Sequence, residues 1–277
     1  MENDNIIVEK YIHQLKGLSN NESELLQKLY SLDKTLFTSS DIARIINKKK
    51  ESVYQITYNL KQKGWIREIE KGKYYIKNLN GYDIAINEPY VLATNIVFPS
   101  YLSFWSSLHF YGFTEQIPQK VLVATTKNKK NIELNGLYIQ FIQIAKKRLF
   151  GYKKMRSNNL EFFVAEKEKA ILDSLYLPQY AGGLSEVSKV IFNAIDEIDM
   201  DLLVYYALKM CNKSLVKRLG YLLELLEIDD TLQLEKNIDG GYSLLDPSKP
   251  KQSNYNKKWK LIVNISPQDL LYWRELY

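Results

Sequence analysis

The chain has 277 residues, enough for two domains with substantial cores or for one large domain. Its hydrophobic fraction of 45% and charged fraction of 25% are ordinary for a globular protein, and its net charge is +6. No apolar run approaches the ~20 residues that a membrane-spanning helix needs, and the acidic, polar start MENDNIIVEK lacks the pattern of a signal peptide. We therefore expect a cytoplasmic protein without membrane contact.

Cysteine and histidine are too scarce for a disulfide framework or a zinc site. The chain has one cysteine, Cys211, and two histidines, His13 and His109, all far apart in sequence. Cys211 falls in an apolar helical pattern, so we expect a small core residue, and His13 is expected at a surface or packing position. Neither a metal nor a cofactor is predicted.

Two amphipathic helices are predicted near the start of the chain. Apolar residues recur at helical spacing over Asn5–Leu15 and again over Glu22–Leu32. The second would be the first helix of the fold formed by the stretch that follows it. The first would be an additional helix that packs on this fold or pairs with a second subunit.

The stretch 38–76 has the pattern of a winged helix-turn-helix. A short helix capped by Ser39 or Ser40 precedes a basic turn at 47–50, and a second helix ends at Gly64. The apolar side of the first helix carries Ile42, Ala43, Ile45 and Ile46, and that of the second carries Val53, Ile56, Thr57 and Leu60.

Two short runs, Trp65–Ile69 and Lys73–Ile76, then flank a turn as a β-hairpin would. Residues 48–77 contain nine Lys or Arg and three acids, so their net charge is 9 − 3 = +6. Lysines on the turn and the hairpin can neutralise phosphates, while short polar side chains of the second helix can meet base edges. The predicted DNA-binding residues are Lys48, Lys49, Lys50, Ser52, Gln55, Tyr58, Asn59, Gln62, Lys71 and Lys73. The alternative is that these lysines form a solvated face and that the module binds an acidic protein partner.

A loop-like composition after the hairpin places a domain boundary near Asn80, so we expect a domain 1–80 and a second, larger domain 81–277. In the second domain, strands are predicted over 121–125, 137–144, 160–165 and 259–263. Helices are predicted over 101–111 with Ser100 as cap, and over 166–175, 184–195, 201–210, 215–226 and 267–276. Residues 90–98 fit either a helix or a strand. The expected fold class is α+β, with a small sheet followed by several helices.

Several motifs of the second domain resemble a known family. They are YLSFWSSLHFYGFTEQIP at 101–118, VLVATT, RLFGY at 148–152 and VAEKEKAILDSLYLPQYAGGLSEV at 164–187. In this order they are similar to the antitoxins of type IV abortive-infection toxin–antitoxin systems, called AbiEi. The matching positions are Ser103, Ser107, Leu108, Tyr111, Gly112, Phe150, Gly151, Glu168, Lys169, Ala170 and Asp173.

The resemblance spans residues 22–195 and implies a two-part protein. Its winged helix would bind operator DNA and repress its own operon. Its second domain would counter a nucleotidyltransferase-like toxin without forming a stable complex. Operator sequence and oligomeric state stay open.

A second basic segment lies in the larger domain. Residues 119–157 contain ten Lys or Arg and one acid, so their net charge is 10 − 1 = +9, and they include the aromatic residues Tyr138, Phe141, Phe150 and Tyr152. The candidate surface comprises Lys127, Lys129, Lys130, Lys146, Lys147, Arg148, Lys153 and Lys154. It either follows a nucleic-acid backbone or pairs internally with the acid-rich stretch 161–201.

The sequence favours a protein that is not an enzyme. It contains no Asp/Glu-x-Lys triplet of a nuclease, no Gly-Ser turn of a nucleotidyltransferase and no Gly-Lys-Ser/Thr of a P-loop. The set Ser103, Ser106, Ser107 and His109 lacks the surroundings of a hydrolase nucleophile, so packing or capping is expected. Lys169 and Asp173, four residues apart on a helix, are expected to form a surface pair.

Overall fold

The computed structural model describes residues 17–32, 34–76, 87–157, 160–228, 232–238 and 240–276. The chain divides into two compact units, Met1–Ile96 with Ile132–Leu137, and Val97–Asn131 with Tyr138–Tyr277. Helices and strands are mixed along the chain, consistent with the expected α+β class. The additional helix at 5–15, His13 and the boundary near Asn80 lie outside the described residues.

Three helices form most of the first unit: α2 (Asn20–Ser31), α3 (Ser39–Ile46) and α4 (Lys50–Gln62). Helix α3 is capped by Thr38, not by Ser39 or Ser40 as predicted. The Thr38 side chain accepts a hydrogen bond from the backbone N–H of Asp41, and the Asp41 carboxylate accepts one from the N–H of Thr38 at 2.8 Å. This reciprocal pairing satisfies two N–H groups at once, which either serine alone cannot do.

The first unit also contains a small antiparallel sheet. Strands β2 (Ile66–Glu70) and β3 (Lys73–Ile76) form the predicted hairpin, and β1 (Leu36–Thr38) pairs with the other edge of β3. Gly72 makes the turn with a φ of 76°. Strand β1 was not predicted, because three residues are too few to show an alternating pattern.

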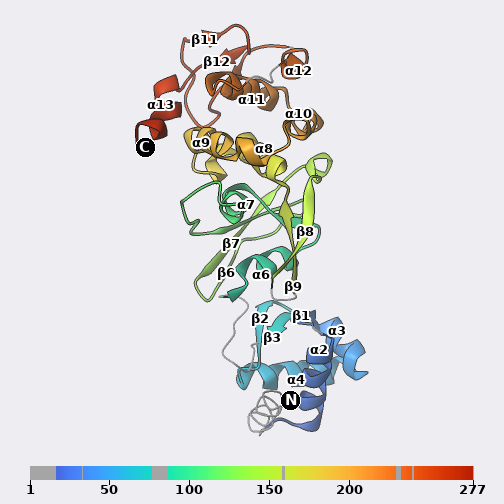
Figure 1. The fold of residues 1–277 in the computed structure, drawn as a ribbon. Helices are drawn as coiled ribbons and strands as arrows, with labels where there is room; N and C mark the ends of the chain where they lie inside the picture. Colours follow the sequence, from blue (N-terminus) through green and yellow to red (C-terminus); the bar gives the residue numbers. More distant parts are fainter. Residues whose placement is uncertain are drawn as a thin grey trace. The chain divides into compact units, whose positions relative to one another are not determined.

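Helices and hairpin share one apolar core, around which they are grouped in Figure 1. Its buried members are Leu25, Leu26, Leu29, Phe37, Ile42, Ile46, Val53, Ile56, Leu60, Ile66, Tyr74 and Ile76. The apolar positions predicted for α4 are all buried, whereas Ala43 and Ile45 of α3 pack at the margin. The segment that fitted either helix or strand contains a helix, α6 (Pro89–Asn95).

The second unit is built on strands paired in the order β7-β5-β4-β9-β8. They are β4 (Ser100–Leu102), β5 (Val121–Thr125), β7 (Leu137–Gln143), β8 (Tyr152–Ser157) and β9 (Leu160–Ala165). Strand β6 (Ile132–Leu134) belongs to the segment 132–137, which is grouped with the first unit. The sheet is mixed, since β4 runs parallel to β9 and antiparallel to β5. The predictions for β5, β7 and β9 are confirmed, while β4, β6 and β8 were not predicted.

The helix predicted over 101–111 with Ser100 as its cap is wrong in its first part. Ser100–Leu102 form a central strand, and helix α7 (Phe104–Phe110) starts only after Ser103. Phe104 has a φ of 53°, so the chain changes direction there. Pairing with β5 and β9, which lie far away in sequence, overrides the local helical spacing of the apolar residues.

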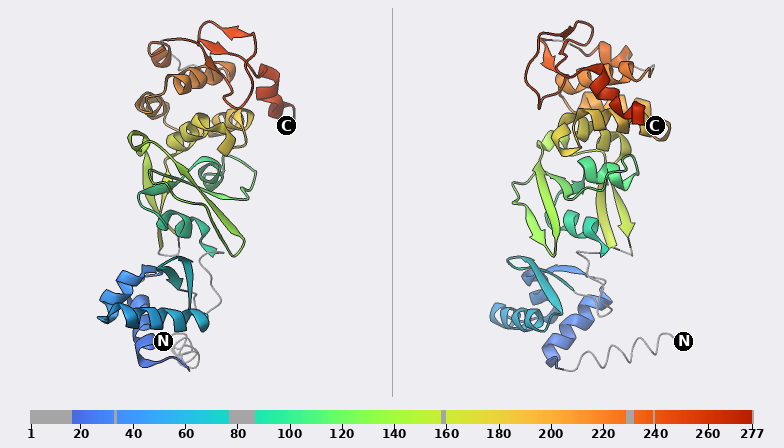
Figure 2. Two further views of the ribbon diagram at one scale, coloured as in Figure 1. Left: turned by 180° about the vertical axis from the view of Figure 1, so that it is seen from behind. Right: turned by 90° about the vertical axis from the view of Figure 1, so that its left-hand side faces the viewer.

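Helices that follow the sheet gather beyond one end of it, as Figures 1 and 2 show. They are α8 (Lys167–Tyr176), α9 (Leu184–Ala194), α10 (Met200–Lys209), α11 (Lys213–Leu225), α12 (Leu232–Glu235) and α13 (Pro267–Leu271), with a 3₁₀ segment at Tyr272–Leu276. A second small sheet is formed by β10 (Ser243–Leu244), β11 (Tyr255–Asn256) and β12 (Leu261–Ile262). The strand predicted over 259–263 is thus shorter than expected.

Cys211 is exposed, contrary to the core position predicted for it. It follows α10 with a φ of 49°, so the chain leaves the helix just before this residue. The apolar periodicity ends at Met210, which is fully buried.

Gly220 of α11 allows Trp259 to pack directly on the helix backbone. A Cβ atom at Gly220 would lie 2.0 Å from the Trp259 ring. We expect Gly220→Ala to lower the free energy of unfolding by about 1–3 kcal/mol, the usual cost of overpacking a core. Urea unfolding measures this loss. Gly241→Ala is the matched control, since a Cβ atom there would have no other atom within 4 Å and the backbone conformation is ordinary. Equal stability of the two variants would contradict the packing argument.

Asp41 gives the first unit a defined pH dependence. Burial raises the pKa of its carboxyl, but hydrogen bonds from Lys34 and Thr38 outweigh this and hold the pKa at about 2. A folded-state pKa below the ordinary value of 3.8 contributes stability above that value, and the contribution is lost as the pH falls toward 2. Between pH 4 and 2, we expect wild type to lose up to about 2 kcal/mol more than Asp41→Asn. Parallel losses in pH-dependent unfolding of both proteins would rule this out.

Candidate nucleic-acid interface

Helix α4 presents an exposed polar side opposite its buried one. Because Val53, Ile56 and Leu60 are held in the core, the residues between them point outward. We define the α4 face as Ser52, Tyr54, Gln55, Tyr58 and Gln62, all of which are exposed. Tyr54, with 71% of its surface accessible, was not predicted as a site residue. Its spacing of four residues from Tyr58 was the available signal.

Asn59 lies at the edge of the α4 face and is only partly exposed. Its side-chain oxygen accepts a hydrogen bond from Nε2 of Gln55 at 3.0 Å. This hydrogen bond orients the Gln55 amide, while Gln55 itself faces solvent.

Three predicted lysine positions form the turn before α4 and the start of the helix. Lys48, Lys49 and Lys50 are exposed, and no carboxylate within the described ranges forms an ion pair with them. Lys49 precedes the helix without a side-chain cap, so the first backbone N–H groups of α4 also point to solvent. Positive side chains and helix N–H groups together suit a phosphate.

The hairpin lysines differ from one another. Lys71 at the tip is exposed and outside the ion pairs of the described chain. Lys73 is held, because its ammonium group contacts the Glu70 carboxylate at 2.7 Å and donates to the Ile96 carbonyl at 2.7 Å. Lys61 and Lys63 pair with Glu68 and Glu22. The local excess of positive charge is therefore concentrated at the turn and the hairpin tip.

The basic surface predicted for the second unit is partly neutralised within the unit. Lys154 and Arg156 both pair with Glu161, at 2.8 and 2.9 Å. Arg148 donates to the Tyr176 hydroxyl at 2.7 Å and to the Met210 carbonyl at 3.2 Å. Lys154 and Arg156 thus pair with an acid of the stretch 161–201, whereas the groups that hold Arg148 are neutral.

Other predicted cations of this surface lie outward. Lys127, Lys130, Lys146, Lys147 and Lys153 are exposed, and Lys129 is partly buried. Two of the interleaved aromatic residues are already packed within the protein. Phe141 is buried, and Tyr152 stacks on Tyr101 with ring centroids 4.9 Å apart.

Lys169 and Asp173 form a buried cluster, not the surface pair that was predicted. Both side chains are almost completely inaccessible, and they form a direct ion pair. Asp173 also accepts hydrogen bonds from the Tyr101 hydroxyl at 2.9 Å and from the Ser103 hydroxyl at 2.8 Å. The prediction was wrong because a spacing of four residues does not distinguish a buried ion pair from an exposed one. The partners that surround the pair, Tyr101 and Ser103, lie about seventy residues away in sequence.

Burial dominates the chemistry of this cluster. It lowers the pKa of the Lys169 ammonium, against the opposing influence of Asp173, and it raises the pKa of the Tyr101 hydroxyl well above the ordinary value. Lys169 also donates to the Tyr101 oxygen at 2.9 Å. Each polar group thus has a partner inside the cluster, as a buried charge requires.

The motif residues behind the family resemblance converge around α8. Gly151 lies so close to Lys169 that a Cβ atom would be 3.1 Å from its side chain. Glu168 accepts a hydrogen bond from the backbone of Asp199, and the Tyr111 hydroxyl donates to the Ala165 carbonyl at 2.7 Å. These contacts join α8 to the segments at Gly151 and Asp199, and the end of α7 to β9, which gives the motifs a structural role.

The serine set is used for packing, as expected. Ser106 donates to the Lys120 carbonyl and accepts from the backbone of Leu122, while Ser107 donates to the Phe104 carbonyl. All three serines of α7 and its start are buried. Within the described ranges, no group of three or more His, Cys, Asp or Glu side chains is arranged to hold a metal ion.

No family model matches the chain, and no curated protein matches its sequence. A solved structure does match in fold: the crystal structure of the RV2827C protein from Mycobacterium tuberculosis, with a TM-score of 0.61. The match covers 93% of this chain and 96% of that one at 13% sequence identity. The two proteins therefore share a fold over nearly their whole lengths. In the described part of the chain, no helix combines the length and apolar character needed to cross a membrane.

Removing one member of the buried pair should be costly. Lys169→Met leaves the Asp173 carboxylate buried without its counter-charge, so we expect a loss of about 3–5 kcal/mol in the free energy of unfolding. The double variant Lys169→Met/Asp173→Leu should recover part of this loss, because no charge is then stranded and only the Tyr101 and Ser103 hydroxyls lose their acceptor. Chemical unfolding of the three proteins measures both steps. A double variant as unstable as the single one would contradict the assignment of the cost to the stranded charge.

Proposed function

We propose that the protein is a DNA-binding repressor and antitoxin of the type IV kind, and that its first unit is a winged helix-turn-helix. The order of elements supports this proposal: α3 and α4 are joined by a short turn, and the β2–β3 hairpin follows as the wing. In such a fold the second helix of the pair enters the major groove.

The α4 face is the observation that carries the proposal. It combines exposed groups that can donate and accept hydrogen bonds with lysines at its N-terminal end and on the hairpin tip. Gln55 suits the edge of adenine, where a side-chain amide can make two hydrogen bonds. Lys49, Lys50 and Lys71 would contact phosphates on either side of the groove.

In this proposal the second unit acts against a nucleotidyltransferase-like toxin without a stable complex and without catalysis of its own. Support comes from the motif resemblance over 101–187 and from the lysines that remain exposed at 127, 130, 146, 147 and 153. These lysines provide a positive surface for an anionic partner such as RNA.

A second candidate function is protein binding by the first unit. Tyr54 and Tyr58 together expose a large aromatic area on the α4 face, and tyrosine is enriched at the energetic centres of protein interfaces. An acidic protein could then occupy the lysine-flanked surface. Binding to duplex DNA separates the two candidates.

Gln55→Ala tests sequence reading. Affinity for DNA from upstream of the gene should fall by about 1–3 kcal/mol, whereas affinity for scrambled duplex should not change. Gel-shift titrations at several salt concentrations measure both, and the affinity of wild type should fall steeply as salt rises. Gln27→Ala on α2 is the matched control, since Gln27 is also exposed but lies on another helix. Undiminished discrimination by Gln55→Ala, or binding insensitive to salt, would remove the DNA-reading proposal.

A further inference from the structure

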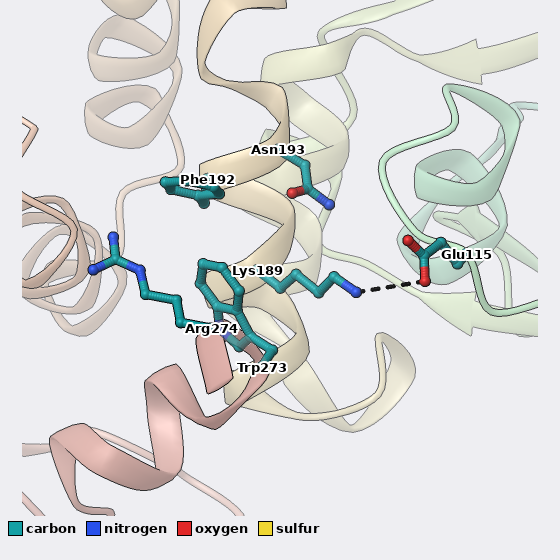
Figure 3. Close-up of a pocket in the computed structure, with 6 residues that line it drawn as sticks. All are labelled: Glu115, Lys189, Phe192, Asn193, Trp273 and Arg274. Atoms are coloured by element: carbon teal, nitrogen blue, oxygen red, sulfur yellow. Dashed lines mark ion pairs between the residues drawn. The ribbon is translucent and has the colours of Figure 1, made fainter. Parts of the chain in front are cut away.

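A groove of about 490 Å³ opens on the second unit. It is lined by Glu115, Lys189, Phe192, Asn193, Trp273 and Arg274 (Figure 3). Three of these residues come from one side of α9, two from the 3₁₀ segment Tyr272–Leu276, and one from the loop after α7. The volume lies within the range of small-molecule sites.

Two aromatic rings form the apolar wall of the groove. Trp273 is buried, and its indole N–H is satisfied by the Leu270 carbonyl at 2.9 Å, so it presents only apolar atoms. Phe192 packs against it with ring centroids 5.1 Å apart, yet 45% of its surface stays accessible. A half-exposed phenyl ring on a rigid support is suited to stacking with a flat ligand ring.

Arg274 places a positive charge over this wall. Its guanidinium carbon lies 5.2 Å from the centre of the Phe192 ring and 5.5 Å from that of Trp273. The side chain is exposed, and no carboxylate of the described residues pairs with it. A guanidinium group held by stacking keeps its N–H groups available, and their planar fork matches a phosphate.

Lys189 extends in the direction opposite to Arg274. Its ammonium group is directed toward the Glu115 carboxylate, as Figure 3 shows, at a distance of 3.7 Å. That distance exceeds hydrogen-bond range, and the Glu115 side chain is 72% exposed. The Lys189 side chain is only 14% exposed, so Arg274 is the cation that faces an incoming ligand.

Asn193 adds a directional polar group. Its side-chain N–H₂ donates to the Phe113 carbonyl at 3.3 Å, which fixes the amide and leaves its oxygen as an acceptor. The groove thus offers an aromatic surface, an exposed guanidinium group and a hydrogen-bond acceptor.

We infer that this groove binds a nucleotide. The base stacks on Phe192, the Arg274 guanidinium binds the phosphate, and Asn193 accepts a hydrogen bond from the base or the ribose. A simple anion would leave the aromatic wall unused, and an uncharged ring would leave the guanidinium unused. Nucleotide binding here is independent of DNA binding by α4, since none of the groove residues belongs to the first unit.

Calorimetric titration of the intact protein tests nucleotide binding. The ligands are adenosine and cytidine 5′-monophosphates, the two nucleosides and inorganic phosphate. We expect the monophosphates to bind about tenfold or more tightly than either the nucleosides or phosphate, because each of these lacks one half of the recognised group. Arg274→Gln and Phe192→Leu should each weaken monophosphate binding by about tenfold or more, one by loss of charge and the other by loss of the ring.

Lys120→Gln is the matched control. Lys120 lines a neighbouring groove of about 420 Å³ and lies over the ring of Tyr138 at 5.3 Å, so it combines a cation and an aromatic ring at another place on the same unit. Its substitution should leave monophosphate binding unchanged. Absence of monophosphate binding, equal affinity for inorganic phosphate, or an equal loss in Lys120→Gln and Arg274→Gln would overturn the inference. The ligand comparison on wild type decides the matter even if a variant does not fold.

Discussion

Everything proposed for the first unit depends on the division of α4 into two sides. The core takes Val53, Ile56, Thr57 and Leu60, and their spacing of three and four residues leaves no freedom for the helix to rotate. The same packing that stabilises the unit therefore decides which polar side chains reach solvent. Helix α2 adds to this constraint, because its buried Glu22 holds Lys63 at the end of α4.

Local sequence patterns were sufficient to predict a helix or strand where that element buries one of its faces. The limits of α4, of the hairpin and of strands β5 and β9 follow from periodicity and from Gly64 and Gly72, and they were predicted within a residue or two. The α4 face could be predicted for the same reason. Tyr54 was missed because a tyrosine at that position fits a packing role as well as an exposed one.

Local sequence patterns did not predict the structure where contacts with distant segments determine it. Ser100–Leu102 become a strand because β5 and β9 lie on both sides of them, and nothing in the local sequence reports this. The groove could not be predicted either, since Glu115, Lys189 and Arg274 are brought together only by the fold. The motif residues around α8 also depend on distant segments. Their order along the chain resembles that of a known family, and in the structure they join α8 and β9 to neighbouring segments.

The buried charge pair has a consequence for how this domain can change over time. Tyr101, Ser103, Lys169 and Asp173 satisfy one another inside the protein, and their burial keeps solvent from replacing a missing partner. A chain that loses the lysine alone passes through an unstable intermediate, whereas loss of both charges avoids it. Among descendants of this fold, the two positions are therefore expected to change together, so that paired substitution becomes an evolutionary record of the contact.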